Sequence, residues 1–185
     1  MRRIGSLILI KNLIKDKYVA SISPSSRFLI KKIFKRIDFN GDLLVVEYGA
    51  GTGVITKALL KKMSKNSKLI AIEKNKVLFN LLQNFKDDRL RLINEDVSDI
   101  ARVANLINKR KADYVISGIP FSMLKPNEIE KIIKWTNNIL SKNGKFILYQ
   151  VSILMKKYLI KSFKRVKIGF ESRNIPPFFI LEAQK

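Results

Sequence analysis

The feature that most constrains this chain is a set of glycines that follows directly on an apolar run. Residues 43–53 read Leu-Leu-Val-Val-Glu-Tyr-Gly-Ala-Gly-Thr-Gly. A short run rich in Val and Leu is typical of a buried strand, and glycine lets a backbone turn sharply and approach a ligand closely. From Val54 onward, apolar residues recur at helical spacing with lysines between them. The sequence therefore predicts a strand, a glycine loop and an amphipathic helix in succession.

The spacing of the glycines distinguishes between the ligands that such a loop can bind. A dinucleotide loop reads G-x-G-x-x-G and a phosphate loop reads G-x-x-x-x-G-K-[ST], and neither pattern fits here. The alternation from Glu47 to Gly53 instead resembles motif I of class I S-adenosylmethionine-dependent methyltransferases. The alternative is an ordinary glycine-rich turn between strand and helix. The resemblance implies that the loop backbone packs against the methionine part of the cofactor, with the cofactor-binding residues Glu47, Tyr48, Gly49, Ala50, Gly51 and Gly53.

Two further strands, each followed by an acid, support this interpretation. Residues 68–73 form an apolar run that ends in Glu73, about 20 residues beyond the loop, where a second strand brings a carboxylate to a ribose. Residues 90–97 begin with strand-like alternation, and Asp96 occupies the place where this enzyme class holds the adenine amine, with Val97 lining the ring. The alternative is that these acids cap helices. The resemblance also implies that Lys74, Glu95 and Ser117 bind the cofactor.

Composition predicts one compact domain and excludes several kinds of chemistry. The chain has 185 residues, of which 46% are hydrophobic, so it can bury a real core. It contains no Cys and no His, so we expect no disulfides, no thiolate chemistry and no metal. Its apolar runs fall short of the roughly 20 residues that a membrane span needs. We therefore expect a cytoplasmic protein that does not cross a bilayer.

Positive charge is the second informative feature. The formal net charge is +22, and residues 1–37 hold ten Lys and Arg residues against one acid, Asp16. Apolar residues between Ile4 and Ile14 fall at helical spacing, so this segment can lie in a membrane interface or can pack on the sheet as an extra helix. A second amphipathic helix begins at Ser23 and Pro24 and runs to Ile37. We therefore divide the chain into basic amphipathic helices, 1–37, and a methyltransferase domain, 38–185.

Several segments together resemble the bacterial phospholipid N-methyltransferases, from about Ser23 to Ile180. They are the Ser-Pro-Ser-Ser-Arg-Phe segment at 23–28, the glycine loop, the Ala-Ile-Glu segment at 71–73, the Ser-Gly-Ile-Pro-Phe segment at 117–121 and the Arg-Asn-Ile-Pro-Pro segment at 173–177. Members of that family methylate the amine of phosphatidylethanolamine stepwise toward phosphatidylcholine and sit on membranes through an N-terminal helix. The resemblance implies that Ser25 and Ser26 also contact the cofactor.

The chain is also similar to the ribosomal RNA adenine dimethyltransferases. Their motif after the fourth strand is Asn-[Ile/Leu]-Pro-[Tyr/Phe], in which the Asn side chain and the Pro carbonyl hold the target amine. Here Gly118 stands where Asn would be, which removes the bidentate contact with an adenine edge. Phe121 faces the methylated amine or is a core aromatic. The resemblance places the catalytic loop at Ser117, Gly118, Ile119, Pro120 and Phe121.

The remaining pattern completes the predicted fold. Residues 126–140 predict a helix, 141–144 a turn and 145–151 a strand, and segments 163–170 and 175–181 predict a closing antiparallel hairpin. Alternating elements indicate a Rossmann-like, seven-stranded, doubly wound α/β sheet.

We expect a phosphatidylethanolamine N-methyltransferase that uses S-adenosylmethionine at an anionic membrane surface. The alternatives are an RNA adenine methyltransferase and a non-catalytic protein that binds membranes or RNA. The proton acceptor for the amine stays open between a backbone carbonyl of the 117–120 loop, a water and a Tyr such as Tyr18. The oligomeric state also stays open.

Overall fold

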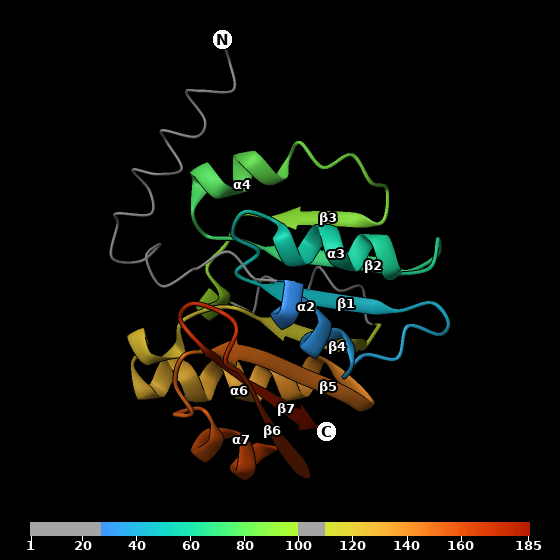
Figure 1. Cartoon of the computed structure of the whole chain (residues 1–185). Helices are drawn as coiled ribbons and strands as arrows, with labels where there is room; N and C mark the ends of the chain where they lie inside the picture. The colour runs from blue at the N-terminus through green and yellow to red at the C-terminus, as the bar shows by residue number, and fades with distance from the viewer. Residues whose placement is uncertain (1–26, 100–109) are drawn as a thin grey trace.

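In the computed structural model of the chain, which describes residues 27–99 and 110–185, a seven-stranded sheet forms the centre of the molecule (Figure 1). The strand order is β3-β2-β1-β4-β5-β7-β6. All neighbouring pairs are parallel except those that involve β7. The strands are β1 Leu44–Tyr48, β2 Lys68–Ile72, β3 Leu90–Ile93, β4 Ala112–Ser117, β5 Leu140–Gln150, β6 Arg165–Glu171 and β7 Phe178–Gln184.

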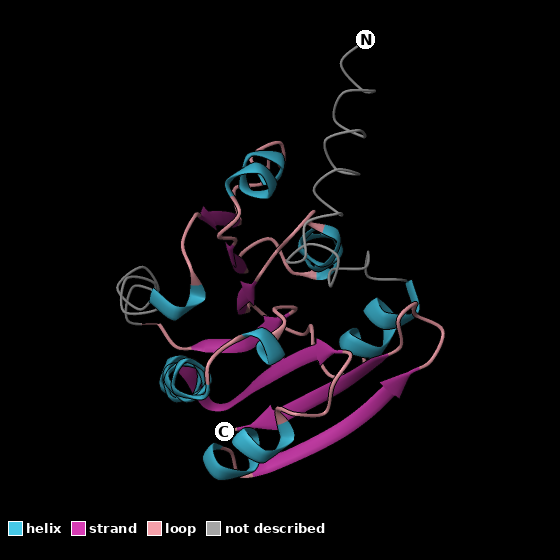
Figure 2. Cartoon of the chain, turned by 90° about the vertical axis from the view of Figure 1, so that its left-hand side faces the viewer, coloured by secondary structure: helices cyan, strands magenta, loops and turns pink. Residues whose placement is uncertain are grey.

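Helices cover both faces of this sheet (Figure 2). One face carries α2 and α3, whose buried residues Leu29, Ile33 and Leu59 share a core cluster with strand residues. The opposite face carries α6 and α7 over a second cluster that includes Phe146 and Phe163. The strands between them therefore read as nearly continuous apolar runs, as expected for a sheet buried on both sides. The helices are α2 Arg27–Phe34, α3 Val54–Lys62, α4 Lys76–Leu82, α6 Pro126–Ile139 and α7 Lys156–Ser162, with short 3-10 turns at Val97–Asp99 and Phe121–Met123.

The carboxyl ends of the parallel strands meet at one edge of the sheet, on the left of Figure 1. From β1 the chain first adds β2 and β3 on one side, and it then crosses back to add β4 and β5 on the other side. The strand order therefore reverses between β1 and β4, and ligands bind at such a point in open α/β sheets. The loop between β6 and β7 lies at the same edge, because Gln150 pairs with Phe179 and Glu171 pairs with Phe178. Loops that follow β1, β2, β4 and β5 and the hairpin loop 172–177 thus share one end of the molecule, which faces the viewer in Figure 2.

The predicted fold class is confirmed, including the C-terminal antiparallel hairpin. The predicted turn at 141–144 is wrong as an element boundary, because Leu140 already pairs with Ala112 and β5 continues through an irregularity before Lys145 pairs with Tyr114. Helix α7 was not predicted from the sequence. The expected helix at residues 4–14 and the helix start at Ser23 lie outside the described residues. In the described part of the chain, no helix is long and apolar enough to span a membrane.

Candidate functional site

The glycine loop has the left-handed backbone conformation that its sequence suggests. Gly49, Gly51 and Gly53 have φ values of 71°, 58° and 80°, in the region that side chains rarely adopt. The Gly49 amide donates to the Ile72 carbonyl at 2.9 Å, so the loop is held against the end of β2. A Cβ on Gly49 would lie 2.6 Å from Cγ2 of Ile119. Glycine is therefore required at position 49 both for the turn and for the close approach of the loop after β4.

Glu73 ties two loops together at the carboxyl edge. Its side chain follows β2 and is nearly buried, with 5% of the residue exposed. Oε2 accepts a hydrogen bond from the Gly51 amide and Oε1 accepts one from the Asn75 amide, each at 2.8 Å. A carboxylate oxygen can accept a second hydrogen bond, and Glu73 lines the pocket described below. The same residue can therefore fix the glycine loop and accept from ligand hydroxyls.

Asp96 lies on the far side of the same pocket and starts a 3-10 turn. Its Oδ1 accepts from the Ser98 amide and hydroxyl, both at 2.8 Å, and Lys74 Nζ lies 3.4 Å from Oδ2. Burial raises the pKa of the Asp96 carboxyl, but the Ser98 hydrogen bonds and the charge of Lys74 outweigh burial and hold that pKa below its usual value. Asp96 is therefore a carboxylate near neutral pH. These contacts confirm the alternative that Asp96 caps the next turn, and Asp96 also lines the pocket.

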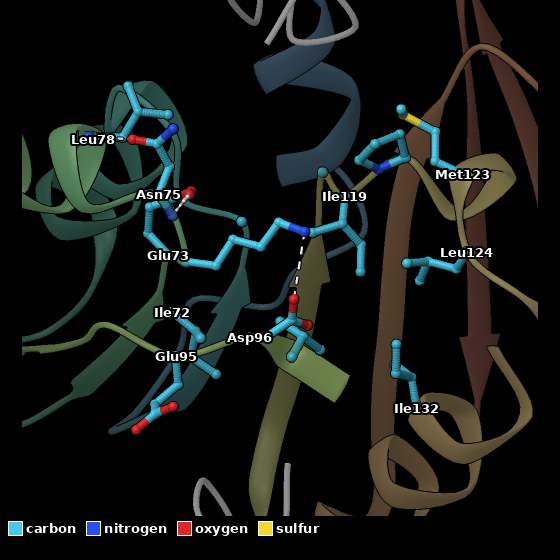
Figure 3. Close-up of a pocket in the computed structure, with 15 residues that line it drawn as sticks. Ile72, Glu73, Asn75, Leu78, Glu95, Asp96, Ile119, Met123, Leu124 and Ile132 are labelled. Atoms are coloured by element: carbon cyan, nitrogen blue, oxygen red, sulfur yellow. Dashed lines mark hydrogen bonds and ion pairs between the residues drawn. The ribbon is translucent and has the colours of Figure 1, made fainter. Parts of the chain in front are cut away.

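A pocket of about 130 Å³ lies between these elements (Figure 3). Glu73 and Asn75 lie on one side of it, Met123, Leu124 and Ile132 lie on the other, and Asp96 lies between the two groups. Most of the lining is aliphatic, with the acids at one end. The lining residues that the sequence predicted as site residues are Gly49, Glu73, Lys74, Glu95, Asp96, Val97, Gly118, Ile119 and Pro120.

Glu47 lies beneath the glycine loop and is not among the lining residues. Its Oε2 accepts from the Thr56 hydroxyl at 2.6 Å, and within the described residues Oε1 has no hydrogen-bond partner. Complete burial raises the pKa of this carboxyl to about 8; the Thr56 hydrogen bond opposes that rise, and the charge of Glu73 adds to it. The side chain is therefore neutral at pH 7 and joins the loop to helix α3. Its contact with a cofactor stays a prediction.

The loop after β4 joins the glycine loop at the switch point. The Gly118 amide donates to the Tyr48 carbonyl at 3.1 Å, and Gly118, Ile119 and Pro120 line the pocket. Ser117 is fully buried. Phe121 is also fully buried and packs edge-on against Phe146, with ring centroids 6.4 Å apart, so the structure favours the core alternative for this ring.

Gly118 has a neighbour that the sequence did not indicate. A Cβ at this position would lie 2.3 Å from the hydroxyl oxygen of Tyr149, near the end of β5. Tyr149 is half-buried and packs edge-on against Phe178 at 5.9 Å between ring centroids. The phenol therefore fills the space that a side chain at 118 would enter.

The structure places the other predicted site residues as follows. The backbones of Tyr48, Ala50, Gly51 and Gly53 build the loop without lining the pocket, and Ser25 and Ser26 lie outside the described residues. Sequence reasoning missed Ile72, Asn75, Leu78, Met123, Leu124 and Ile132. Asn75 could have been found, because an Asn directly before an apolar helical run is an N-cap signal, and its side chain does accept from the Val77 and Leu78 amides. The aliphatic residues carried no such signal.

S-adenosylmethionine fits the chemistry of this site. The nearly buried Glu73 carboxylate suits a ribose diol, and the Asp96 carboxylate and the Val97 side chain suit an adenine amine and ring. The glycine loop turns through positive φ at Gly49, Gly51 and Gly53, and Gly49 lines the pocket where the cofactor would bind. In the described part of the chain, no group of three or more acidic, His or Cys side chains could hold a metal ion.

Comparisons with known proteins agree with this geometry. The family model described as ribosomal RNA adenine dimethylase matches residues 13–146. An ornithine lipid N-methyltransferase from Singulisphaera acidiphila is 28% identical over 86% of this chain and 84% of its own length. Ribosomal RNA small subunit methyltransferase A from Malacoplasma penetrans is 34% identical over 66% of this chain, which spans only 44% of that relative.

A solved structure shares the fold. The crystal structure of precorrin-6y C5,15-methyltransferase from Geobacter metallireducens superposes with a TM-score of 0.69 at 18% identity, covering 92% of this chain and 96% of that one. The glycine loop, the two carboxylates and these matches lead to one conclusion. The chain is a class I S-adenosylmethionine-dependent methyltransferase and belongs to the ribosomal RNA adenine dimethylase family.

Proposed function

We propose that this enzyme methylates the primary amine of a membrane lipid headgroup of the phosphatidylethanolamine type, at an anionic membrane surface. The observation that carries the proposal is the pairing of Gly118 with Tyr149. The relative from Singulisphaera acidiphila, named as an ornithine lipid N-methyltransferase, supports it because the match extends over most of both chains. Ornithine lipid is accordingly the second headgroup to test.

The Gly118–Tyr149 pairing bears on the choice between a lipid and a nucleobase. A base-reading Asn at 118 would have its Cβ 2.3 Å from the Tyr149 hydroxyl, so the residue could not be introduced without moving that ring. The loop therefore lacks the amide that hydrogen-bonds an adenine edge. An alkyl amine on a flexible headgroup has no planar hydrogen-bonding edge like that of adenine. Its binding therefore requires only space for the amine and a hydrogen-bond acceptor that contacts it.

The side chains at the site suit an amine nucleophile. A primary amine is protonated at neutral pH and must lose its proton before it can attack. The aliphatic wall of Met123, Leu124 and Ile132 disfavours a charged ammonium, because burial penalises the charged form. Carbonyls of the 117–120 loop and the Tyr149 hydroxyl can accept a hydrogen bond as the proton leaves. The bound cofactor supplies a methyl group already activated on a sulfonium, so the protein's task is to position the amine and exclude water.

RNA adenine methylation is the second candidate. The family model supports it, and a net charge of +22 would suit phosphate contacts. Against it stands the glycine at position 118, where the motif of the RNA enzymes has Asn.

The two candidates can be separated in one assay. The full chain is incubated with methyl-labelled cofactor and with vesicles containing phosphatidylethanolamine, vesicles containing ornithine lipid, or ribosomal RNA. We expect label in the organic phase with phosphatidylethanolamine. Label in RNA alone would refute the proposal, and label only with ornithine lipid would correct the headgroup. A thermal shift with cofactor but no transfer to any acceptor would favour the non-catalytic alternative.

A further inference from the structure

Exposed aliphatic side chains gather at the carboxyl edge of the sheet. Met123 follows β4, Val151, Ile153 and Leu154 follow β5, and Ile175 lies in the hairpin loop between β6 and β7. Between 36% and 87% of each residue is exposed, and Ile175 has the highest value. We call these five residues the apolar rim. Large exposed apolar groups scattered singly are ordinary, but five on adjoining loops at one end of a molecule mark an interaction surface.

A basic cluster adjoins the apolar rim. A cavity of about 400 Å³ is lined by Arg27, Phe28, Lys31 and Lys32 of α2, by Lys35 just after α2, and by Arg173 of the hairpin loop. Arg173 lies two residues before Ile175, so the cluster and the rim meet on one loop. Among the residues that line this cavity there is no acid. The cluster therefore presents positive charge beside the aliphatic surface.

The geometry of Arg173 is held from two sides. Its Nε and Nη2 donate to the Glu171 carboxylate at 2.8 and 2.9 Å, and its guanidinium lies 4.1 Å from the centre of the Phe28 ring. The Arg173 guanidinium, followed by Lys32, lowers the pKa of Glu171 to about 2. The Arg173 side chain is still 57% exposed, so its outer edge faces solvent. The hairpin loop is thereby held against α2, which joins Ile175 of the rim to the cluster.

We propose that the apolar rim and the basic cluster together form the face that docks on an anionic lipid bilayer. A cationic surface with protruding aliphatic side chains matches an anionic interface, where lysines and arginines meet headgroups and apolar groups enter the acyl boundary. RNA would also match the charge, and the exposed Phe170 ring at the end of β6 offers one stacking surface for a base, but the five rim residues are aliphatic, which suits lipid acyl chains better than bases. The positive charge of the cluster favours an anionic partner, and the exposed aliphatic side chains of the rim favour a lipid bilayer.

Docking at this edge would bring lipid headgroups to the reaction pocket. Met123 belongs to the rim and also lines the pocket with Gly118 and Pro120. A headgroup at the interface would therefore enter the pocket without leaving the membrane surface. The inference deepens the proposed function and rests on it for its purpose, but binding can be measured without any methyl transfer.

The test is sedimentation of the full chain with vesicles of phosphatidylcholine, with and without phosphatidylglycerol. Neither lipid has a primary amine, so methylation does not enter the measurement. We expect binding to the anionic vesicles that falls with added salt. The variant Lys31→Gln/Lys35→Gln should bind roughly 30-fold more weakly, at about fivefold per charge. The variant Ile153→Ser/Ile175→Ser should bind at least about tenfold more weakly, because two aliphatic groups no longer enter the bilayer.

Matched variants elsewhere serve as controls. Lys61→Gln/Lys62→Gln removes two exposed charges at the carboxyl end of α3. Ile160→Ser/Ile168→Ser removes two exposed aliphatic groups, one on α7 and one in the middle of β6. Both should bind vesicles within about twofold of the original chain. Thermal unfolding by circular dichroism checks that every variant is folded.

Three results would overturn the docking face. They are no binding of the original chain to anionic vesicles, unchanged binding of the rim and cluster variants, or an equal loss in the controls. Losses in RNA binding alone would assign the surface to nucleic acid instead. Methylation of phosphatidylethanolamine in detergent micelles without vesicle binding would refute docking and leave the proposed function standing. Vesicle binding without lipid methylation would do the reverse.

Discussion

The two halves of the sheet, on either side of the β1–β4 switch point, are built in different ways. On the β1–β2 side, backbone hydrogen bonds join the glycine loop to Ile72 at the end of β2, and the Glu73 carboxylate accepts from the Gly51 amide. On the β4–β5–β7 side, the site depends on side chains from segments far apart in the sequence, such as Gly118 with Tyr149 and Phe28 with Arg173. The cofactor half is therefore shaped mainly by backbone geometry, and the other half is shaped by the packing of side chains.

Substitution at Gly49 should have the largest effect, because this residue joins the two halves. In Gly49→Ala, a Cβ would meet Ile119 and would hold a positive φ, so we expect cofactor affinity to fall at least roughly 100-fold, about 3 kcal/mol. Isothermal titration calorimetry measures the change. Gly41→Ala is the control: Gly41 has φ 82° and open space around its Cβ position, so it should lose about 1 kcal/mol of stability and keep its affinity. Equal losses of affinity would disprove the close-approach argument.

Glu47 should make the cofactor half sensitive to pH. Its pKa is about 8 when folded and 4.5 ordinarily, so folding takes up a proton above the lower value. Stability from this group is fully present below about pH 4.5 and is lost as pH rises through 8. We expect the free energy of unfolding to fall by on the order of 5 kcal/mol across this range and Glu47→Gln to flatten the slope. Urea titrations at several pH values measure it, and equal slopes in both proteins would contradict it.

Substitution of Glu73 tests whether the carboxylate that holds the glycine loop also binds the cofactor. Glu73→Gln removes the charge that favours hydrogen bonds from the Gly51 amide and from ligand hydroxyls, so cofactor affinity should fall about 30-fold, near 2 kcal/mol. Glu130→Gln, at an exposed position on α6, is the control and should bind like the original chain. Calorimetry that shows unchanged affinity in Glu73→Gln would remove this residue from the site.

The Gly118–Tyr149 contact should affect acceptor use alone. In Gly118→Ala, the Cβ would displace the Tyr149 hydroxyl, and we expect lipid methylation about tenfold slower with cofactor affinity within about twofold. Tyr149→Leu in the same chain frees the space and should recover part of the rate if crowding is the cause. A double-mutant cycle on turnover measures the coupling, and additive effects would show that the two residues act independently.

Much of the cofactor half could be predicted from the sequence. Strand β1, the glycine loop and α3 are contiguous, and their signals depend on local backbone requirements at Gly49, Gly51 and Gly53. The acid after β2 followed from the spacing of parallel strands, and the role of the acid after β3 followed from the resemblance to class I methyltransferases. Pocket residues such as Leu78 and Ile132 could not be predicted, because an aliphatic residue in a helix looks the same whether it faces a core or a cavity.

The sequence by itself determined most of the succession of strands and helices along the chain, the glycine loop and the positive charge. These features depend on single residues or on short segments: periodicity and backbone freedom are local, and each ionisable side chain carries its own charge. Only the tertiary structure decided that Tyr149 fills the space beside Gly118, that Arg173 stacks on Phe28, and that aliphatic residues from three loops form one rim. Gly118 and Tyr149 are 31 positions apart along the chain, and Phe28 and Arg173 are 145 positions apart. Side-chain contacts of that kind arise from packing, which a linear pattern does not specify.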